Sequence, residues 1–186
     1  MGISLTTQMS SKANLASPSF TGTLTSAGQI VGQTPVSISF YGNPTMYSNA
    51  GVLQTTGFTR QQASFHLLFS TYTNRNWTPT YTSTYKLAVP YTGLYSLQFT
   101  FSSATACQCF QFISKNMGNG TEIGAWTDKM IASSAPTIPA TLTNSISGTA
   151  YLTTSDYICF SIYTITGSIT YYDRTCATIT LIQRTA

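Results

Sequence analysis

Charge is what this sequence has least of. Lys, Arg, Asp and Glu make up only 6% of its 186 residues, against about 25% in an ordinary soluble protein. Ser, Thr, Tyr and Phe are abundant instead, so hydroxyls, amides and aromatic rings must cover much of the surface. Because so few charges do little to keep copies of a protein apart, this composition favours self-association.

The sequence also lacks the features that direct a chain to nucleic acid or to a membrane. Its eight basic residues are scattered from Lys12 to Arg184 with no two adjacent, so the pI near 8.9 predicts no nucleic-acid partner. No stretch approaches the ~18 to 20 consecutive apolar residues of a membrane span, and the N-terminus has no signal-peptide pattern. We therefore expect no membrane insertion and no secretion. The sequons at Asn76 and Asn119 would accept glycans only in the secretory pathway.

Side chains that usually perform catalysis or bind metals are scarce. His66 is the only histidine, so no His-rich metal site fits within one chain, and we expect this residue at the surface or at an interface. Paired-carboxylate hydrolysis needs two acids about 5 to 10 Å apart, and only Glu122 and Asp128 are close in sequence. The complete set of acids is Glu122, Asp128, Asp156 and Asp173. We predict no catalytic, cofactor-binding or metal-binding residue, and hence no enzyme.

Four cysteines remain as candidates for redox or structural chemistry. Cys107 and Cys109 alternate on one predicted strand and so share a face, while Cys159 and Cys176 lie on two others. A zinc site would normally show a Cys-x-x-Cys turn. We expect free thiols, buried or at an interface, in a reducing compartment. A disulfide between strands is the alternative, and the sequence favours no particular pairing.

Apolar residues recur with a period of two along most of the chain, which is typical of half-buried β-strands. No window keeps a helical period, and β-branched residues and Tyr dominate. Residues 122–139, with two prolines, are expected to form a long surface connection. Strands are expected over residues 36–41, 62–69, 94–101, 107–114, 146–152, 157–163 and 176–181.

The composition changes near residue 55. Residues 1–55 are rich in Ser, Thr, Gly and Gln and carry only short apolar runs. We expect them to form an extended N-terminal neck, and residues 56–186 to form the globular head.

Several stretches of the head resemble one known family. Residues 87–97 read LAVPYTGLYSL, which is similar to the aromatic-x-x-Pro-x-x-Gly-x-Tyr-x-Phe signature of the globular head of the first complement component and the tumour necrosis factor ligands. Residues 152–158 resemble the family's Leu-x-x-Gly-Asp-x-Val turn, with Ser155 in place of Gly and Asp156 as the turn residue. Residues 62–69 and 175–182 take the places of its opening and closing strands. The resemblance implies an all-β, two-sheet antiparallel jelly roll (TNF-like) that forms homotrimers.

The neck carries a second resemblance. Residues 13–25 read ANLASPSFTGTLT, which is similar to the Asn-Leu-x-Ser-Pro-x-Phe-Thr-Gly repeat of tail fibres and surface proteins of phages and large DNA viruses. Leu15, Phe20 and Leu24 cannot be buried by one extended chain, but three chains wound together can bury them. Both resemblances therefore imply a threefold assembly.

Together these features predict a non-enzymatic homotrimer on a virion surface, assembled in the host cytoplasm beside other virion proteins. It would serve either as a fibre head that binds a host glycan or protein, or as a minor capsid or vertex protein that binds no host ligand. A secreted TNF-like receptor ligand is the alternative from another class. Aromatic side chains suit sugar stacking or, equally, interface and core packing; the candidates are Trp77, Tyr81, Tyr91, Trp126, Tyr171 and Tyr172.

Overall fold

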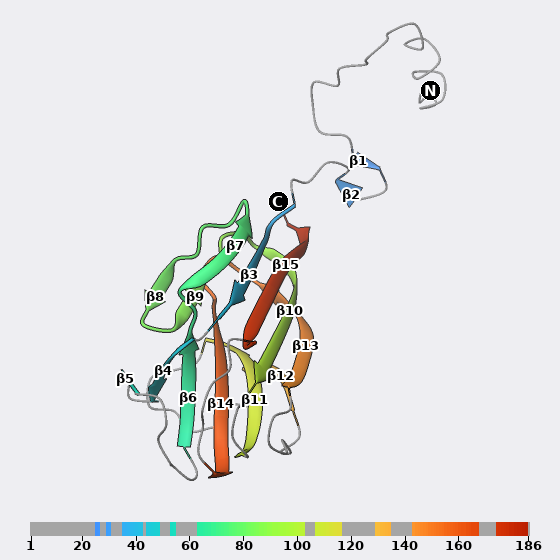
Figure 1. Ribbon diagram of the computed structural model, residues 1–186. Coiled ribbons are helices and arrows are strands. Elements are labelled where there is room, and N and C mark those ends of the chain that lie inside the picture. Colours follow the sequence, from blue (N-terminus) through green and yellow to red (C-terminus); the bar gives the residue numbers. More distant parts are fainter. Residues whose placement is uncertain are drawn as a thin grey trace, which may run out of the picture. The chain divides into compact units, whose positions relative to one another are not determined.

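The computed structural model (Figure 1) describes residues 25–26, 29–30, 35–42, 44–48, 53–54, 63–102, 107–116, 129–134, 143–167 and 174–185. The chain divides into two compact units, Met1–Gln33 and Thr34–Ala186. In the first unit, β1 (Thr25–Ser26) pairs antiparallel with β2 (Gln29–Ile30). Every regular element in the described ranges is a β-strand, as the period of two predicted.

One layer of the second unit is a five-stranded antiparallel sheet in the order β13-β10-β15-β3-β7. Its central strands are seen side by side in Figure 1. The bounds are β13 (Thr143–Leu152), β10 (Gly93–Ser102), β15 (Cys176–Arg184), β3 (Ser37–Tyr41) and β7 (Thr71–Arg75).

The other layer is an eight-stranded sheet in the order β12-β11-β14-β6-β4-β5, with the β8–β9 hairpin joined to the start of β14. The chain changes layers between β10 and β11, between β12 and β13, and again before β14 and β15. These crossovers make the two-sheet antiparallel jelly roll that was predicted, and that prediction is confirmed. The bounds are β12 (Met130–Ser133), β11 (Cys107–Lys115), β14 (Tyr157–Gly167), β6 (Ala63–Leu68), β4 (Thr45–Ser48), β5 (Leu53–Gln54), β8 (Tyr81–Ser83) and β9 (Lys86–Ala88).

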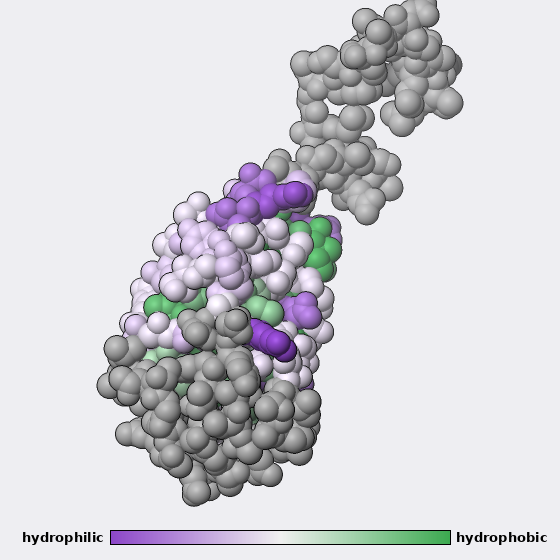
Figure 2. Space-filling view, viewed as in Figure 1, coloured by the Kyte–Doolittle hydropathy of each residue, from purple (hydrophilic) through white to green (hydrophobic). Residues whose placement is uncertain are grey.

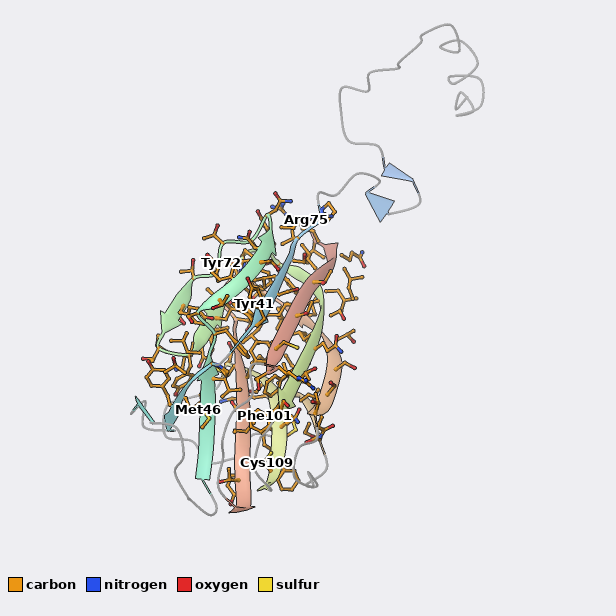
Figure 3. All side chains as sticks on the ribbon, viewed as in Figure 1. Tyr41, Met46, Tyr72, Arg75, Phe101 and Cys109 are labelled. Atoms are coloured by element: carbon orange, nitrogen blue, oxygen red, sulfur yellow. The ribbon has the colours of Figure 1, made fainter. Side chains whose placement is uncertain are left out.

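The hydrophobic core fills the space between the two sheets. Alternate residues of β10 are fully buried, and Phe99 packs against Phe160 of the opposite sheet with ring centroids 5.5 Å apart. Figure 3 labels Phe101 of β10 and Cys109 of β11, two further buried residues, one from each layer. Burial of each large apolar side chain stabilises the fold by about 1.5–3 kcal/mol.

Part of the predicted neck belongs to the sandwich. Strand β3 lies between β15 and β7, and its residues Ile38 and Phe40 are buried in the core. The compact unit begins at Thr34, whereas the predicted boundary lay between residues 55 and 56, so the two boundaries do not coincide. The strand pattern of residues 36–41 was visible in the sequence, but one of its two partner strands, β15, lies more than a hundred residues away. The fibre-type repeat of residues 13–25 lies outside the described residues except for Thr25, the first residue of β1.

Gly93 opens β10 at a place where no side chain fits. A Cβ atom there would lie 2.2 Å from the backbone oxygen of Gln183 and 2.8 Å from a methyl carbon of Leu181. The register between β10 and β15 shifts at the next residue pair, as in a β-bulge. Two residues further on, the ring of Tyr95 is fully buried and its hydroxyl donates a hydrogen bond to the Tyr91 carbonyl at 2.6 Å. Gly93 therefore permits the close approach of β10 to β15, and the ring of Tyr95 is part of the core.

Strand β12 corrects one expectation about the connections. It lies within residues 122–139, which were expected to be irregular, and it packs across the sandwich rim at Gly148 of β13. A Cβ at Gly148 would approach the Ile131 carbonyl oxygen to 2.9 Å, so glycine permits this contact. The short segment Met130–Ser133 shows too little alternation of apolar and polar residues to predict a strand.

Candidate interaction surface

The side of the five-stranded sheet that points away from the core is the most distinctive surface among the described residues. The pairing register aligns outward residues in rows across the strands; one row holds Ser147, Gln98, Thr178, Ser39 and Thr73. We call this surface the hydroxyl face. Its members are Ser37, Ser39, Tyr41, Thr71, Thr73, Arg75, Ser96, Gln98, Thr100, Ser145, Ser147, Thr149, Tyr151, Cys176, Thr178 and Thr180.

Hydroxyl groups on this face bind one another across the strands. The Thr100 and Ser145 hydroxyl oxygens are 2.7 Å apart, and those of Ser39 and Thr178 are 3.3 Å apart. Such cross-strand pairs stabilise a sheet by about 0.2–1 kcal/mol each. Each hydroxyl can also accept further hydrogen bonds, so the face can still contact another polar surface.

The hydroxyl face is almost uncharged and bears two exposed tyrosines. Of its members only Arg75, on the edge strand β7, is ionised. The exposed large hydrophobic residues among those described are Tyr41, Tyr72, Tyr151 and Ile182, and two of them, Tyr41 and Tyr151, belong to this face. Figure 2 shows intermediate hydropathy over much of the described surface in this view. A neutral surface with exposed aromatic residues is suited to contact with another neutral surface.

Asp156 closes the turn between β13 and β14, as the family motif implied. Its Oδ2 atom accepts hydrogen bonds from the Thr153 backbone N–H at 2.7 Å and from the Thr153 hydroxyl at 2.9 Å. Partial burial opposes ionisation, but these bonds, the Asn116 amide and the charge of Lys115 outweigh it and lower the pKa of the Asp156 carboxyl. The carboxylate is therefore a structural group.

The prediction that His66 lies at the surface or at an interface is wrong for this chain. The side chain is only 1% exposed, and its Nδ1 atom lies 2.7 Å from the Ser161 Oγ atom. It stacks on the ring of Tyr85 with centroids 4.1 Å apart. Residue 66 was assigned correctly to the mixed face of its strand, but the turn that carries Tyr85 folds over that face.

The cysteines occupy different environments. Cys109 is a buried thiol that faces the core, and Cys159 is a buried thiol on the opposite side of the eight-stranded sheet, while Cys176 is half-buried on the hydroxyl face. The side chain of Cys107 lies outside the described residues.

The described aromatic candidates for sugar stacking make contacts within the fold. Trp77 is 2% exposed and packs edge-on against Tyr95, so its assignment as a stacking residue is corrected to core packing. Tyr81 donates its hydroxyl to the Phe69 carbonyl at 2.9 Å, and Tyr91 lies under the Arg184 guanidinium at 4.1 Å. The remaining candidates lie outside the described residues: Trp126, Tyr171, Tyr172, and the acids Glu122, Asp128 and Asp173.

The described part of the chain contains neither a metal-binding cluster nor a membrane-spanning helix. Within it, no three His, Cys, Asp or Glu residues come close enough to bind a metal ion together. The same residues include no helix of the length and apolarity needed to cross a membrane.

The hydroxyl face was missed by sequence reasoning although its signal was present. Outward positions of β10, β13 and β15 are filled by Ser, Thr and Gln at every second residue. Alternation marks the buried side of each strand, but it does not show that the polar sides of different strands form one surface. Only the strand order shows that these polar stripes lie next to one another.

Comparisons with known proteins give a likeness at the level of the backbone. No protein-family model matches the chain, and no curated protein matches it in sequence. Among solved structures, murine APRIL at pH 5.0 is 14% identical with a TM-score of 0.49, and the alignment covers 80% of this chain and 99% of that one. The Eiger TNF of S. frugiperda is 13% identical with a TM-score of 0.43, covering 83% and 96%. At these values neither likeness assigns a function to this chain.

Proposed function

We propose that this chain is a non-enzymatic homotrimer on the surface of a virus particle, and that the hydroxyl face forms its subunit contacts. The observation that carries the proposal is the near absence of charge across five adjacent strands, where ordinary protein surfaces are mixed and charged. Tyr41 and Tyr151 supply apolar area that such a contact would bury.

The two sequence resemblances support the trimeric state and the viral location. The head resembles a family of trimers, and residues 13–25 resemble a repeat of viral fibres and surface proteins. The particle would carry the protein as a fibre head for host attachment or as a capsid-surface component. The scarcity of acids and the single, buried histidine support a structural role rather than catalysis.

The solution mass of the whole chain tests the assembly. Light scattering on a size-exclusion column should give about three times the 20.1 kDa of the monomer. A lysine at Thr178, on the central strand β15, would place like charges in the contact and should shift the mass toward the monomer, because such juxtaposition costs several kcal/mol. The matched control is Ser133→Lys, at an exposed position on the other sheet.

A stable monomer of the wild-type chain would contradict the proposed trimer. If the trimer tolerates Thr178→Lys as well as Ser133→Lys, the subunit contact does not lie on the hydroxyl face. Host attachment is tested separately, by applying the wild-type protein and the Thr178→Lys variant to a glycan array and to host cells. A fibre head should bind as a trimer and lose most of its apparent affinity as a monomer, since linked sites gain avidity. A capsid-surface component should bind in neither form.

A further inference from the structure

The outward side of the eight-stranded sheet carries a small second cluster, separate from the main core. Tyr85, at the tip of the β8–β9 hairpin, is 3% exposed and packs there with Cys159, Tyr47 and Tyr157. The rings of Tyr47 and Tyr85 are 6.4 Å apart, and the ammonium of Lys86 lies 4.8 Å from the ring of Tyr157. The tip of a surface hairpin is thus folded back onto the sheet.

His66 lies beneath this hairpin tip. It faces Tyr47 across β4 and Ser161 across β14 in the pairing register, and Tyr85 covers its ring. With an interplanar angle of 13° and a centroid distance of 4.1 Å, the two rings are in stacking contact. We propose that His66 is an acid-sensitive latch that holds the Tyr85 turn, residues 83–86, on the outward side of the eight-stranded sheet.

The surroundings of His66 disfavour a positive charge. The titratable groups that flank it are Tyr47 on β4, Tyr157, Cys159 and Tyr163 on β14, and Tyr85 and Lys86 in the turn. No carboxylate occurs among these flanking residues. The described carboxylate of Asp156 is held by Thr153 and Asn116, with Lys115 as its neighbouring cation.

Burial and, second, the charge of Lys86 lower the pKa of His66 from its ordinary 6.5 to about 4. The folded, latched state therefore binds fewer protons than a state in which the imidazole reaches water. Stability of the latch is present above about pH 6.5 and is lost as the pH falls from there toward 4. Stacking of Tyr85 on an imidazolium would offset part of this loss but not the desolvation of a buried charge.

Release of the turn is the expected consequence, because the rest of the fold has its own support. Leu87, next in the chain, stays in the main core and pairs with Ile158 of β14. Beyond Tyr81, which is hydrogen-bonded to Phe69, the turn is anchored more weakly: Ser83 and Thr84 are exposed, and the Thr82 hydroxyl bond to the Lys86 carbonyl is long at 3.4 Å. Between pH 6.5 and 4 the ratio of released to latched turn should rise on the order of 100-fold.

The single histidine makes the test direct on the unaltered, full-length protein. Proton NMR shows only one imidazole C2–H signal, and it should titrate well below pH 6.5. Hydrogen exchange at each pH, expressed as protection relative to an unstructured chain, should fall first for residues 81–86, while residues 97–99 of β10 stay protected. An imidazole that titrates near 6.5 in the folded protein, or a turn that stays protected down to pH 4, would overturn the proposal. So would equal loss of protection in the turn and in β10, which would mean global unfolding.

Two variants separate the latch from general acid sensitivity. His66→Gln removes the titrating group, so the protection of the turn should no longer depend on pH between 6.5 and 4, whether the turn stays closed or is open throughout. An unchanged pH dependence in this variant would rule out His66 as the trigger. Lys86→Gln removes the nearby cation and should move the His66 titration toward higher pH; no movement would contradict the electrostatic part of the argument. Lys86→Gln also serves if His66→Gln does not fold.

Discussion

The side-chain amide of Asn116 bridges the β13–β14 turn from a distant strand end: its Nδ2 donates to the Asp156 carboxylate, and its Oδ1 accepts from the Tyr157 backbone N–H at 3.0 Å. Asn116 has a φ of 54°, a left-handed conformation that Asn tolerates better than most residues. Asn116 therefore links the end of β11 to the start of β14. The Asp156 carboxylate accepts hydrogen bonds from both Asn116 and Thr153.

Replacing Asp156 by Ala should destabilise the sandwich by about 2 kcal/mol, the cost typical of removing hydrogen bonds to a charged group. The loss is reduced because the carboxylate is partly exposed. Chemical denaturation measures the effect, with Thr154→Ala at an exposed position of the same turn as the control. An equal effect of both substitutions would contradict the role given to the Asp156 carboxylate.

The Asp156 carboxylate should also make the stability of the fold decrease at acidic pH. Because its folded pKa is lowered, its contribution is present above the ordinary pKa near 3.8 and is lost as the pH falls through the lowered value. Wild-type stability should thus decline below about pH 4 more steeply than that of Asp156→Asn, in a window below that of His66. Thermal melts between pH 5 and 2 would show whether the two curves converge at low pH, as expected.

Gly93→Ala should be the most damaging of the glycine substitutions, because the new methyl would overlap the Gln183 carbonyl oxygen. Overpacking of this kind costs about 1–3 kcal/mol or more. Gly42→Ala is the matched control: its φ is 88° but no atom lies within 4 Å of the added carbon, so only backbone strain of about 1–2 kcal/mol applies. A smaller loss for Gly93→Ala than for Gly42→Ala in denaturant melts would argue against the close approach of β10 and β15.

Gln111→Met should raise the melting temperature. Gln111 is fully buried on the core side of β11, and both polar atoms of its side chain have no hydrogen-bond partner in the protein. Burial of an unsatisfied polar group costs about 1–3 kcal/mol, which methionine of similar length would avoid. Gln183→Met, at an exposed position, should change little. A lower melting temperature for Gln111→Met would mean that the amide makes a stabilising interaction in solution.

Two N-terminal truncations should behave differently. Removal of residues 1–33 leaves the compact unit Thr34–Ala186 intact, so its cooperative unfolding should persist. Removal of residues 1–55 deletes β3 and β4, and with them Ile38 and Phe40 from the core, at about 1.5–3 kcal/mol for each large side chain. Circular dichroism melts should show a folded first variant and an unfolded or strongly destabilised second one. A fully stable second variant would place the domain boundary after residue 55.

The fold followed from the sequence wherever one strand face is apolar. Residues 94–101 and 157–163 alternate so regularly that burial on one side was readable in advance. Strand β7 was missed because all five of its residues are exposed, so no apolar alternation marks it. Pairing with β3 through the backbone makes it a strand, and backbone hydrogen bonds leave no trace in side-chain patterns.

The environments of single side chains were harder to predict than the strands. Trp77 follows the exposed strand β7 and sits in a Thr-rich segment, yet its indole is enclosed by the core. His66 was placed on the correct strand face, but that face is covered by residues about twenty positions further along the chain. Local sequence states which way a side chain points, whereas tertiary contacts decide what covers it.

The near absence of charge on the hydroxyl face has a consequence for the media in which an assembly could persist. Contacts between ionised groups weaken as ionic strength rises, since the screening length shrinks from about 30 Å at 0.01 M to about 3 Å at 1 M salt. An interface made of Ser, Thr, Gln and Tyr has almost no such contacts to lose. Salts that are excluded from protein surfaces would even strengthen it. An assembly built on this face would therefore tolerate dilute fresh water and brine alike.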